Sequence, residues 1–205
     1  MNRGMVLGAV AGLLLAGCSG GSGSAKPSHA SAPTAVALPA SGCPSGVVPA
    51  GFALDAAHSG ALQPADYSES GDVQAAMIYD DYQGGYRTVY TDLKPGTAAV
   101  ALVVECVALQ FSTPANASRF VAAFTALRQD AGSLARQVTP STKIGTTTLE
   151  YEETGQGFAG YGITSTDVVE MAAVDGDHFD TVSVAGPNPP AALAVSLLEG
   201  VVNNT

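Results

Sequence analysis

The sequence predicts an α+β domain in which a curved antiparallel sheet has two helices packed against it. Strand-like runs of apolar and β-branched residues follow one another with short turns between them, which favours antiparallel pairing. Twice a strand is followed by a capping residue, a proline and an amphipathic helix, at Thr113-Pro114 and at Asn188-Pro189. The two helices must bury their apolar stripes against the sheet.

The predicted domain begins with an arm and a hairpin. Residues 44–72 are rich in Gly, Pro, Ala and Ser and lack a clear period, so we expect an ordered arm with short pieces of helix. Residues 73–79 and 86–92 are predicted strands because β-branched and aromatic residues recur there. Gln83-Gly84-Gly85 between them is typical of a hairpin turn.

A central strand and the first long helix follow. After a turn at Lys94-Pro95-Gly96, the apolar run from Ala98 to Phe111 predicts a strand buried on both faces. Thr113-Pro114 then supplies the cap and first residue of a helix that ends near Gly132. Arg119 and Arg128 lie outside its apolar stripe, which consists of Phe120, Phe124, Leu127 and Ala131.

The second half of the domain repeats this pattern. Turns rich in Gly or Asp separate four predicted strands, at residues 144–152, 158–164, 167–174 and 178–185. Asn188-Pro189 then begins the closing helix, whose apolar stripe consists of Leu193, Leu197, Leu198 and Val201.

The N-terminus carries the pattern of an export signal. Arg3 precedes an apolar core of about a dozen residues, shorter than the roughly 20 that a membrane-spanning helix needs. The core ends in Leu15-Ala16-Gly17-Cys18, which resembles the lipobox of bacterial lipoproteins. The resemblance implies that residues 1–17 are a signal peptide and that Cys18 carries diacylglycerol and palmitate-type chains. The alternative is a plain secretory signal in which Cys18 is incidental.

A tether is predicted between this anchor and the domain. Residues 18–42 are nearly all Ser, Gly, Ala, Pro and Thr, and such a segment cannot bury enough apolar surface to become ordered. Residues 43–205 then form the extracytoplasmic domain, whose length of about 160 residues fits one domain. We expect the protein to lie on the extracytoplasmic face of the cell membrane, held through Cys18.

The charge balance limits the partners of the domain. Acidic residues outnumber Lys and Arg by 18 to 8, and the basic residues form no cluster. Nucleic acid binding needs a basic patch, so we expect no nucleic acid partner. No polybasic segment would hold the domain against anionic lipid headgroups.

Three cysteines occur in the chain. With Cys18 assigned to the lipid, Cys43 and Cys106 remain as an even pair in an oxidising compartment, and we predict a disulfide between them. The loop it closes would contribute roughly 3–4 kcal/mol to stability. The alternative is two free thiols or a metal pair, although two cysteines without clustered histidines make a poor zinc site.

Two motifs have the letters of a functional site. Residues 155–160 match G-x-G-x-x-G, but a dinucleotide site needs a helix next, and the following residues are strand-like, so we predict a hairpin or bulge. Residues 175–180 hold three carboxylates and His178, which favours either a hairpin turn at Asp175-Gly176 or, as the minor alternative, a metal site. We assign no metal and no cofactor.

Candidate catalytic groups are few. Asp80-Asp81 and the carboxylates of residues 150–153 are interpreted as solvated strand ends, since no acid or base partner is evident beside them. His58 lies in the arm with Asp55 and Ser59 nearby, which leaves a hydrolase triad open as a minor alternative. We assign no catalytic residue.

Glu105 interrupts the apolar run, where a charge is costly unless it is paired or lies at an edge. We expect a structural ion pair with Arg87 or Arg119, or a contact with a ligand in a cavity.

The function that these features favour is a non-enzymatic, membrane-tethered binding or sensor module for a small apolar envelope ligand or an envelope protein. The pattern V-x-x-V-A-L-Q-F-S-T-P-x-x-A from Val104 onward resembles small lipoproteins and sensor-type extracellular domains of actinobacteria, over roughly residues 100–200. The chain departs from the sensor-type pattern in having one disulfide pair instead of two. The alternatives are a structural surface lipoprotein without a small ligand and an envelope hydrolase.

Overall fold

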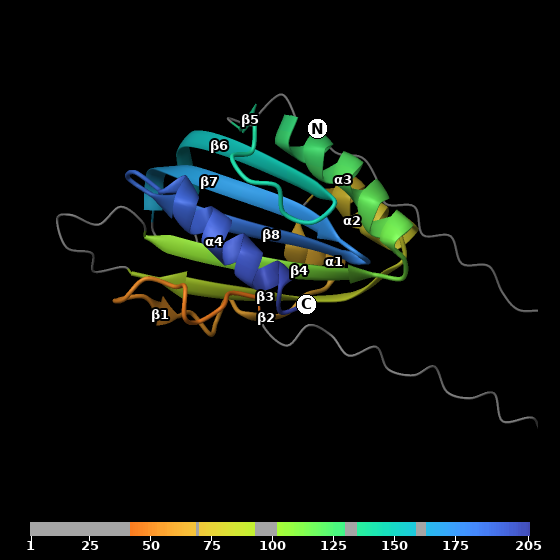
Figure 1. Ribbon diagram of the computed structural model, residues 1–205, viewed down its shortest axis with the longest axis horizontal. Helices are drawn as coiled ribbons and strands as arrows, with labels where there is room; N and C mark the ends of the chain where they lie inside the picture. Colours follow the sequence, from red (N-terminus) through yellow and green to blue (C-terminus); the bar gives the residue numbers. More distant parts are fainter. Residues whose placement is uncertain (1–41, 69, 93–101, 130–134, 159–162) are drawn as a thin grey trace, which may run out of the picture. The chain divides into compact units, whose positions relative to one another are not determined.

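A computed structural model describes residues 42–68, 70–92, 102–129, 135–158 and 163–205, and these residues form one α+β domain (Figure 1). The predicted fold class is confirmed. Within the described residues the elements in chain order are β1 (Ala53–Leu54), β2 (Gly60–Ala61), α1 (Pro64–Tyr67), α2 (Gly71–Tyr79), β3 (Tyr82–Thr91), β4 (Val103–Phe111), α3 (Pro114–Gln129), β5 (Arg136–Val138), β6 (Thr147–Phe158), β7 (Ile163–Asp175), β8 (His178–Gly186) and α4 (Ala191–Val202).

The strands form one sheet in the order β1-β3-β4-β8-β7-β6-β5, with β2 pairing the same outer edge of β3 as β1 does. All the pairings are antiparallel. At the centre, Cys106 of β4 lies opposite Thr88 of β3 on one side and Val182 of β8 on the other. β4 is buried on both faces, as its apolar sequence predicts.

Each face of the sheet has its own hydrophobic cluster. On the face that we call the α4 face, the apolar side of α4 packs against alternate residues of β4, β7 and β8, together with Cys43 of the arm. On the opposite face, which we call the α3 face, α2 and α3 pack against the intervening residues of the same strands. Figure 1 shows α4 lying across one side of the sheet, away from α1 and α2.

The first strand–proline–helix repeat begins as predicted and the second does not, and the two helices lie on opposite faces of the sheet. Thr113 caps α3, because its Oγ1 accepts a hydrogen bond from the Asn116 amide at 3.2 Å. α4 starts later than predicted, with Pro190 in the cap position and no side-chain hydrogen bond there. Because β4 and β8 are neighbours, the two helices sandwich the centre of the sheet between them.

The predicted hairpin of residues 73–79 and 86–92 is wrong. Residues 71–79 form helix α2, in which Val73 and Met77 lie one turn apart and are both buried against the α3 face. β3 instead runs straight through Gln83-Gly84-Gly85 and pairs with β4. Gly85 is required there, because a Cβ atom would lie 2.6 Å from the Ala108 carbonyl oxygen.

The long strands of the second half extend further than predicted. β6 ends at Phe158 and β7 begins at Ile163, and residues 159–162 of the predicted strand at 158–164 lie outside the described residues. The short edge strand β5 was not predicted. Residues 155–158 of the G-x-G-x-x-G match lie at the end of β6, where the register with β7 shifts twice and Gly155 has a φ of +74°. This agrees with the predicted bulge. The predicted turn at residues 94–96 and the helix end at 131–132 lie outside the described residues.

Candidate functional site

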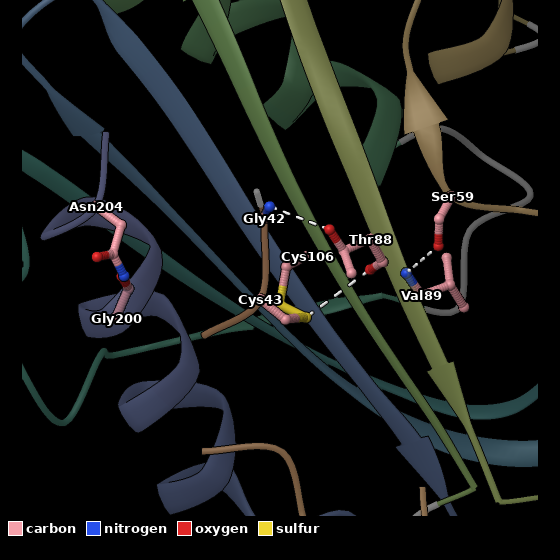
Figure 2. Close-up of a disulfide and its surroundings, with 8 residues drawn as sticks. All are labelled: Gly42, Cys43, Ser59, Thr88, Val89, Cys106, Gly200 and Asn204. Carbon is pink, nitrogen blue, oxygen red and sulfur yellow. Dashed lines mark hydrogen bonds between the residues drawn. A yellow bond between two sulfur atoms is a disulfide. The ribbon is translucent and has the colours of Figure 1, made fainter. Parts of the chain in front are cut away.

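A disulfide joins the arm to the centre of the sheet on the α4 face. The Sγ atoms of Cys43 and Cys106 are bonded, and the half-cystines are separated by 63 positions in sequence. Next to it, the Gly42 amide donates a hydrogen bond to Thr88 Oγ1 at 3.0 Å (Figure 2). A side chain at position 42 would approach the Cys106 carbonyl oxygen within 2.7 Å, so only glycine allows the arm to lie this close.

A groove of about 480 Å³ lies beside this disulfide. Its floor is the α4-face side of β3, and its walls come from the arm, β1 and the C-terminus. Figure 2 places Asn204 and Gly200 at the end of α4 near the disulfide. The residues that line the groove are Cys43, Pro44, Ser45, Gly46, Leu54, Ser59, Tyr86, Thr88, Tyr90 and Asn204.

The lining of the groove is neutral and mixes aromatic, hydroxyl and amide groups. Tyr86, Thr88 and Tyr90 are alternate residues of β3 and therefore share one face. The Ser59 hydroxyl already serves the fold, because it donates to the Asp55 carbonyl at 2.7 Å and accepts from the Val89 amide at 2.9 Å. Within the described residues, the hydroxyls of Tyr86 and Tyr90 form no hydrogen bond, so they are available to a ligand.

A second polar site, which we call the charged band, crosses the α3 face and consists of Tyr67, Arg87, Glu105, Arg128, Glu153 and Glu170. Its first ion pair joins Arg87 Nε to Glu105 Oε1 at 3.4 Å. Arg87 also donates from Nη2 to the Asp66 carbonyl at 2.8 Å, which ties α1 to the sheet. Arg87 is thus the partner of Glu105, whereas Arg119 pairs with Asp80 at 2.8 Å.

The second half of the charged band is built around Arg128 of α3. Its Nη1 lies 3.5 Å from Glu153 Oε1, its Nη2 contacts Glu170 Oε1, and its guanidinium lies 5.3 Å from the centre of the Phe124 ring. Burial raises the pKa of Glu170 to about 7; the positive charge of Arg128 opposes this shift and the negative charge of Glu153 adds to it. Burial also raises the pKa of the Tyr67 hydroxyl, and the Glu170 carboxylate adds to this shift.

The carboxylates that were interpreted as solvated strand ends are in part buried, which is a correction. Glu150 and Glu153 are about 95% inaccessible; Glu150 accepts a long hydrogen bond of 3.4 Å from the Ser141 amide, and Glu153 pairs with Arg128. Glu152 pairs with Arg136 of β5 near the surface. The sequence alone did not reveal these partners because each lies 9 to 25 positions away.

The Asp55, His58 and Ser59 group forms a local turn. His58 Nδ1 lies 2.7 Å from Asp55 Oδ2, and Asp55 Oδ1 accepts a hydrogen bond from the Ala57 amide at 3.1 Å. The hydrogen bond with the His58 side chain contributes most to lowering the pKa of Asp55. The Ser59 proton is donated to the Asp55 carbonyl. This serine is therefore positioned as a structural bridge between the arm and β3 and not as a nucleophile activated by His58.

The cluster at residues 175–180 forms the β7–β8 turn. Asp175 and His178 lie opposite each other across it, and Gly176 has a φ of +56°. Asp180 lies deeper on the α4 face, fully buried, and neither of its carboxylate oxygens has a hydrogen-bond partner among the described residues. Burial raises the pKa of Asp180 to about 8, and the nearby Asp175 charge adds to the shift. Within the described ranges no three His, Cys, Asp or Glu side chains are placed to hold a metal ion.

Sequence reasoning missed the groove and the role of Arg128. The floor of the groove consists of Tyr86, Thr88 and Tyr90, which share one face of β3, and this strand was predicted to pair with residues 73–79 and not with β4. Arg128 was predicted outside the apolar stripe of its helix, which is wrong, because it follows Phe124 by one turn and faces the sheet carboxylates. The position of these carboxylates depends on strand register. Cys18 lies outside the described residues. Of the described helices, none is both long and apolar enough to cross a membrane.

Comparisons with known proteins find structural similarity but no matching family. No family model matches the chain, and no curated protein matches it. The structure is similar to the crystal structure of the extracellular domain of PknH from Mycobacterium tuberculosis, with 15% sequence identity and a TM-score of 0.44, over 75% of this chain and 78% of that chain. A match with a TM-score below 0.5 establishes neither a common fold nor a common function.

Proposed function

We propose that the chain is an extracytoplasmic lipoprotein, held to the cell membrane through Cys18, and that its domain binds a small neutral ligand. The proposal for the anchor is supported by the lipobox-like sequence at residues 15–18 and by the spacer that follows it. The disulfide between Cys43 and Cys106 is of the kind that persists in oxidising compartments and is rare in the cytosol.

The observation that supports ligand binding is the neutral groove beside this disulfide. Among the described residues that line it there is no Asp, Glu, Lys, Arg or His. A charged ligand that left water for this groove would find no opposite charge there, and that transfer is costly. The rings of Tyr86 and Tyr90 offer apolar surface together with hydroxyls, so the groove suits a neutral ligand with both apolar and hydroxyl or amide groups.

The test is native mass spectrometry of the full chain, produced in a host that acylates lipoproteins and released from detergent micelles in the instrument. We expect one additional mass, removable by organic extraction, on the wild-type protein. Tyr86→Ala should lose this mass, and Tyr90→Phe should weaken its retention by removing only a hydroxyl. The matched control is Tyr79→Ala, because Tyr79 is 81% exposed on α2, remote from the groove lining.

A different result would contradict each part of the proposal. The same spectrum gives the mass of the acyl chains, and a chain that keeps its full unmodified N-terminus would overturn the lipid anchor at Cys18. An extra mass that Tyr86→Ala and Tyr79→Ala retain equally would overturn the groove as its site. A reproducibly empty protein would favour a surface lipoprotein that acts through an envelope protein and not through a small ligand.

A further inference from the structure

Helix α3 is attached to the sheet by two different kinds of contact. Near its middle, Phe120 and Phe124 are fully buried, and each ring lies 5.1 Å from Phe179 of β8. In its last turn, Arg128 reaches back to the sheet and contacts Glu153 of β6 and Glu170 of β7. The end of the helix therefore depends on an ionic contact in a place where most of the surrounding residues are buried.

The charged band contains more carboxylates than guanidiniums. Glu105, Glu153 and Glu170 face Arg87 and Arg128, so the band would carry one uncompensated negative charge if all five groups were ionised. Glu170 is the most deeply buried of the carboxylates, with 4% of its surface exposed. Its Oε1 contacts Arg128 and the Ser183 hydroxyl, while its Oε2 has no hydrogen-bond partner among the described residues. A proton on Glu170 would make the band neutral.

We propose that Glu170 acts as a proton-controlled latch that keeps the last turn of α3 closed against the sheet while its carboxyl is protonated. Loss of this proton leaves a buried negative charge in excess of the two guanidiniums, and water is the more favourable environment for that charge. Opening of the last turn of α3 would withdraw Arg128 and hydrate Glu170. The latch closes in mildly acidic conditions and loosens as the pH rises.

The direction follows from the linkage of proton binding to opening. Burial raises the pKa of Glu170 from 4.5 to about 7 in the closed state, and hydration in the open state returns it toward 4.5. A group with a raised pKa stabilises the closed state fully below the lower value, and this contribution is lost as the pH rises through the higher one. The opening equilibrium constant would increase roughly 70-fold between pH 5 and pH 8 if opening hydrates Glu170 fully.

The other groups of the band do not oppose this response. The guanidinium groups of arginine residues stay positively charged over this pH range. Tyr67 of α1, whose pKa burial raises above its usual value, keeps its proton. Glu153 and Glu105, which face Glu170 from β6 and β4, both favour its protonated form by repulsion.

Hydrogen exchange of the full chain between pH 5 and pH 8, corrected for the intrinsic pH dependence of exchange, tests the latch. We expect the opening constant of amides in residues 125–129 to rise by tens of fold and to exceed, at every pH, that of amides in β4 and α4, which exchange only through global unfolding. Glu170→Gln should abolish the rise and hold the turn closed. Asp180→Asn removes the other buried carboxyl of raised pKa, on the α4 face, and should leave the rise intact.

Three results would overturn the latch. They are a full pH response in Glu170→Gln, loss of the response in Asp180→Asn, and opening constants in residues 125–129 equal to those of β4 and α4, which would indicate that the turn opens only by global unfolding. If Glu170→Gln does not fold, carbon-13 NMR of the wild-type carboxyls replaces it. A Glu170 midpoint near 7 supports the latch, and a midpoint near 4.5 contradicts it.

Discussion

The two faces of the sheet carry helices that follow the same strand–proline pattern, yet different forces hold them. On the α4 face, α4 and the arm pack through aliphatic residues, and a disulfide joins the arm to β4. On the α3 face, α3 packs through aromatic rings at its middle and through Arg128 at its end. In addition to apolar packing, a disulfide holds the α4 face and the ionic contacts of Arg128 hold the α3 face.

This difference determines which conditions act on which face. A reductant acts on the α4 face, because the disulfide between Cys43 and Cys106 lies within its apolar cluster. The pH acts on the α3 face through Glu170 and on the α4 face through Asp180, whose carboxylate oxygens have no hydrogen-bond partner among the described residues. The neutral groove lies on the covalently held side, so we expect ligand binding to tolerate changes of pH better than it tolerates reduction.

Loss of the disulfide should produce the largest loss of stability, and it tests whether a covalent bond holds the α4 face. The double substitution Cys43→Ala and Cys106→Ala frees a loop of about 60 residues, which corresponds to a loss of about 4 kcal/mol in the free energy of unfolding. Urea denaturation of the variant and of the reduced wild-type protein measures this loss, and the two should agree. A loss below about 1 kcal/mol would show that packing alone holds the arm to β4.

Asp180→Asn should remove a pH dependence from the α4 face. Between pH 5 and pH 7 the folded wild type keeps Asp180 protonated, because its pKa is raised from 3.8 to about 8, whereas the unfolded chain has it ionised. Unfolding therefore releases one proton from Asp180, which lowers stability by about 1.4 kcal/mol per pH unit as the pH rises. The variant should lose this contribution, about 2.7 kcal/mol over the two units, and keep the contribution of Glu170.

Urea denaturation at pH 5, 6 and 7 measures the slope. The control is Asp177→Asn in the same turn, because the Asp177 side chain is 38% exposed and we expect its removal to leave the slope unchanged. Equal slopes in the wild type and Asp180→Asn would show that Asp180 is ionised in the folded protein, paired through a contact that the described residues do not contain.

Gly200→Ala tests how closely α4 and the arm are packed on the α4 face. Alanine usually stabilises the interior of a helix relative to glycine. Here a Cβ atom at position 200 would lie 2.3 Å from Pro44 Cγ, which belongs to a rigid ring. We expect a net loss of about 2 kcal/mol, the cost typical of overpacking, together with a displaced groove wall at Pro44. An unchanged or higher melting temperature would show that the arm yields.

The sequence predicted elements whose signals are local and missed those whose signals depend on register. β4, α3 and α4 were predicted because a continuous apolar run, the cap at Thr113 and the stripe ending at Val201 can each be seen within a short window. α2 was mistaken for a strand because Val73, Ile78 and Tyr79 favour strands, and the helix-forming Gln74-Ala75-Ala76 between them was given too little weight. The ion pairs of Arg128 required the register of β6 and β7 as well as the position of α3.

The smallest expected effect concerns Glu105, for which the sequence left an ion pair and a ligand contact open. The structure places it 3.4 Å from Arg87, and both side chains are more than 20% exposed. A double-mutant cycle with Glu105→Gln and Arg87→Met should give a coupling energy of about 0.5–1 kcal/mol, as for other partly exposed pairs. The Arg119–Asp80 pair, whose arginine is 52% exposed, is the matched reference on the same protein. A coupling near zero would mean that Arg87 serves α1 through the Asp66 carbonyl alone, and Glu105 would then be free to contact a ligand. A coupling well above that of the reference pair would instead place Glu105 firmly in the charged band, because a lower effective dielectric constant strengthens the attraction between the two charges.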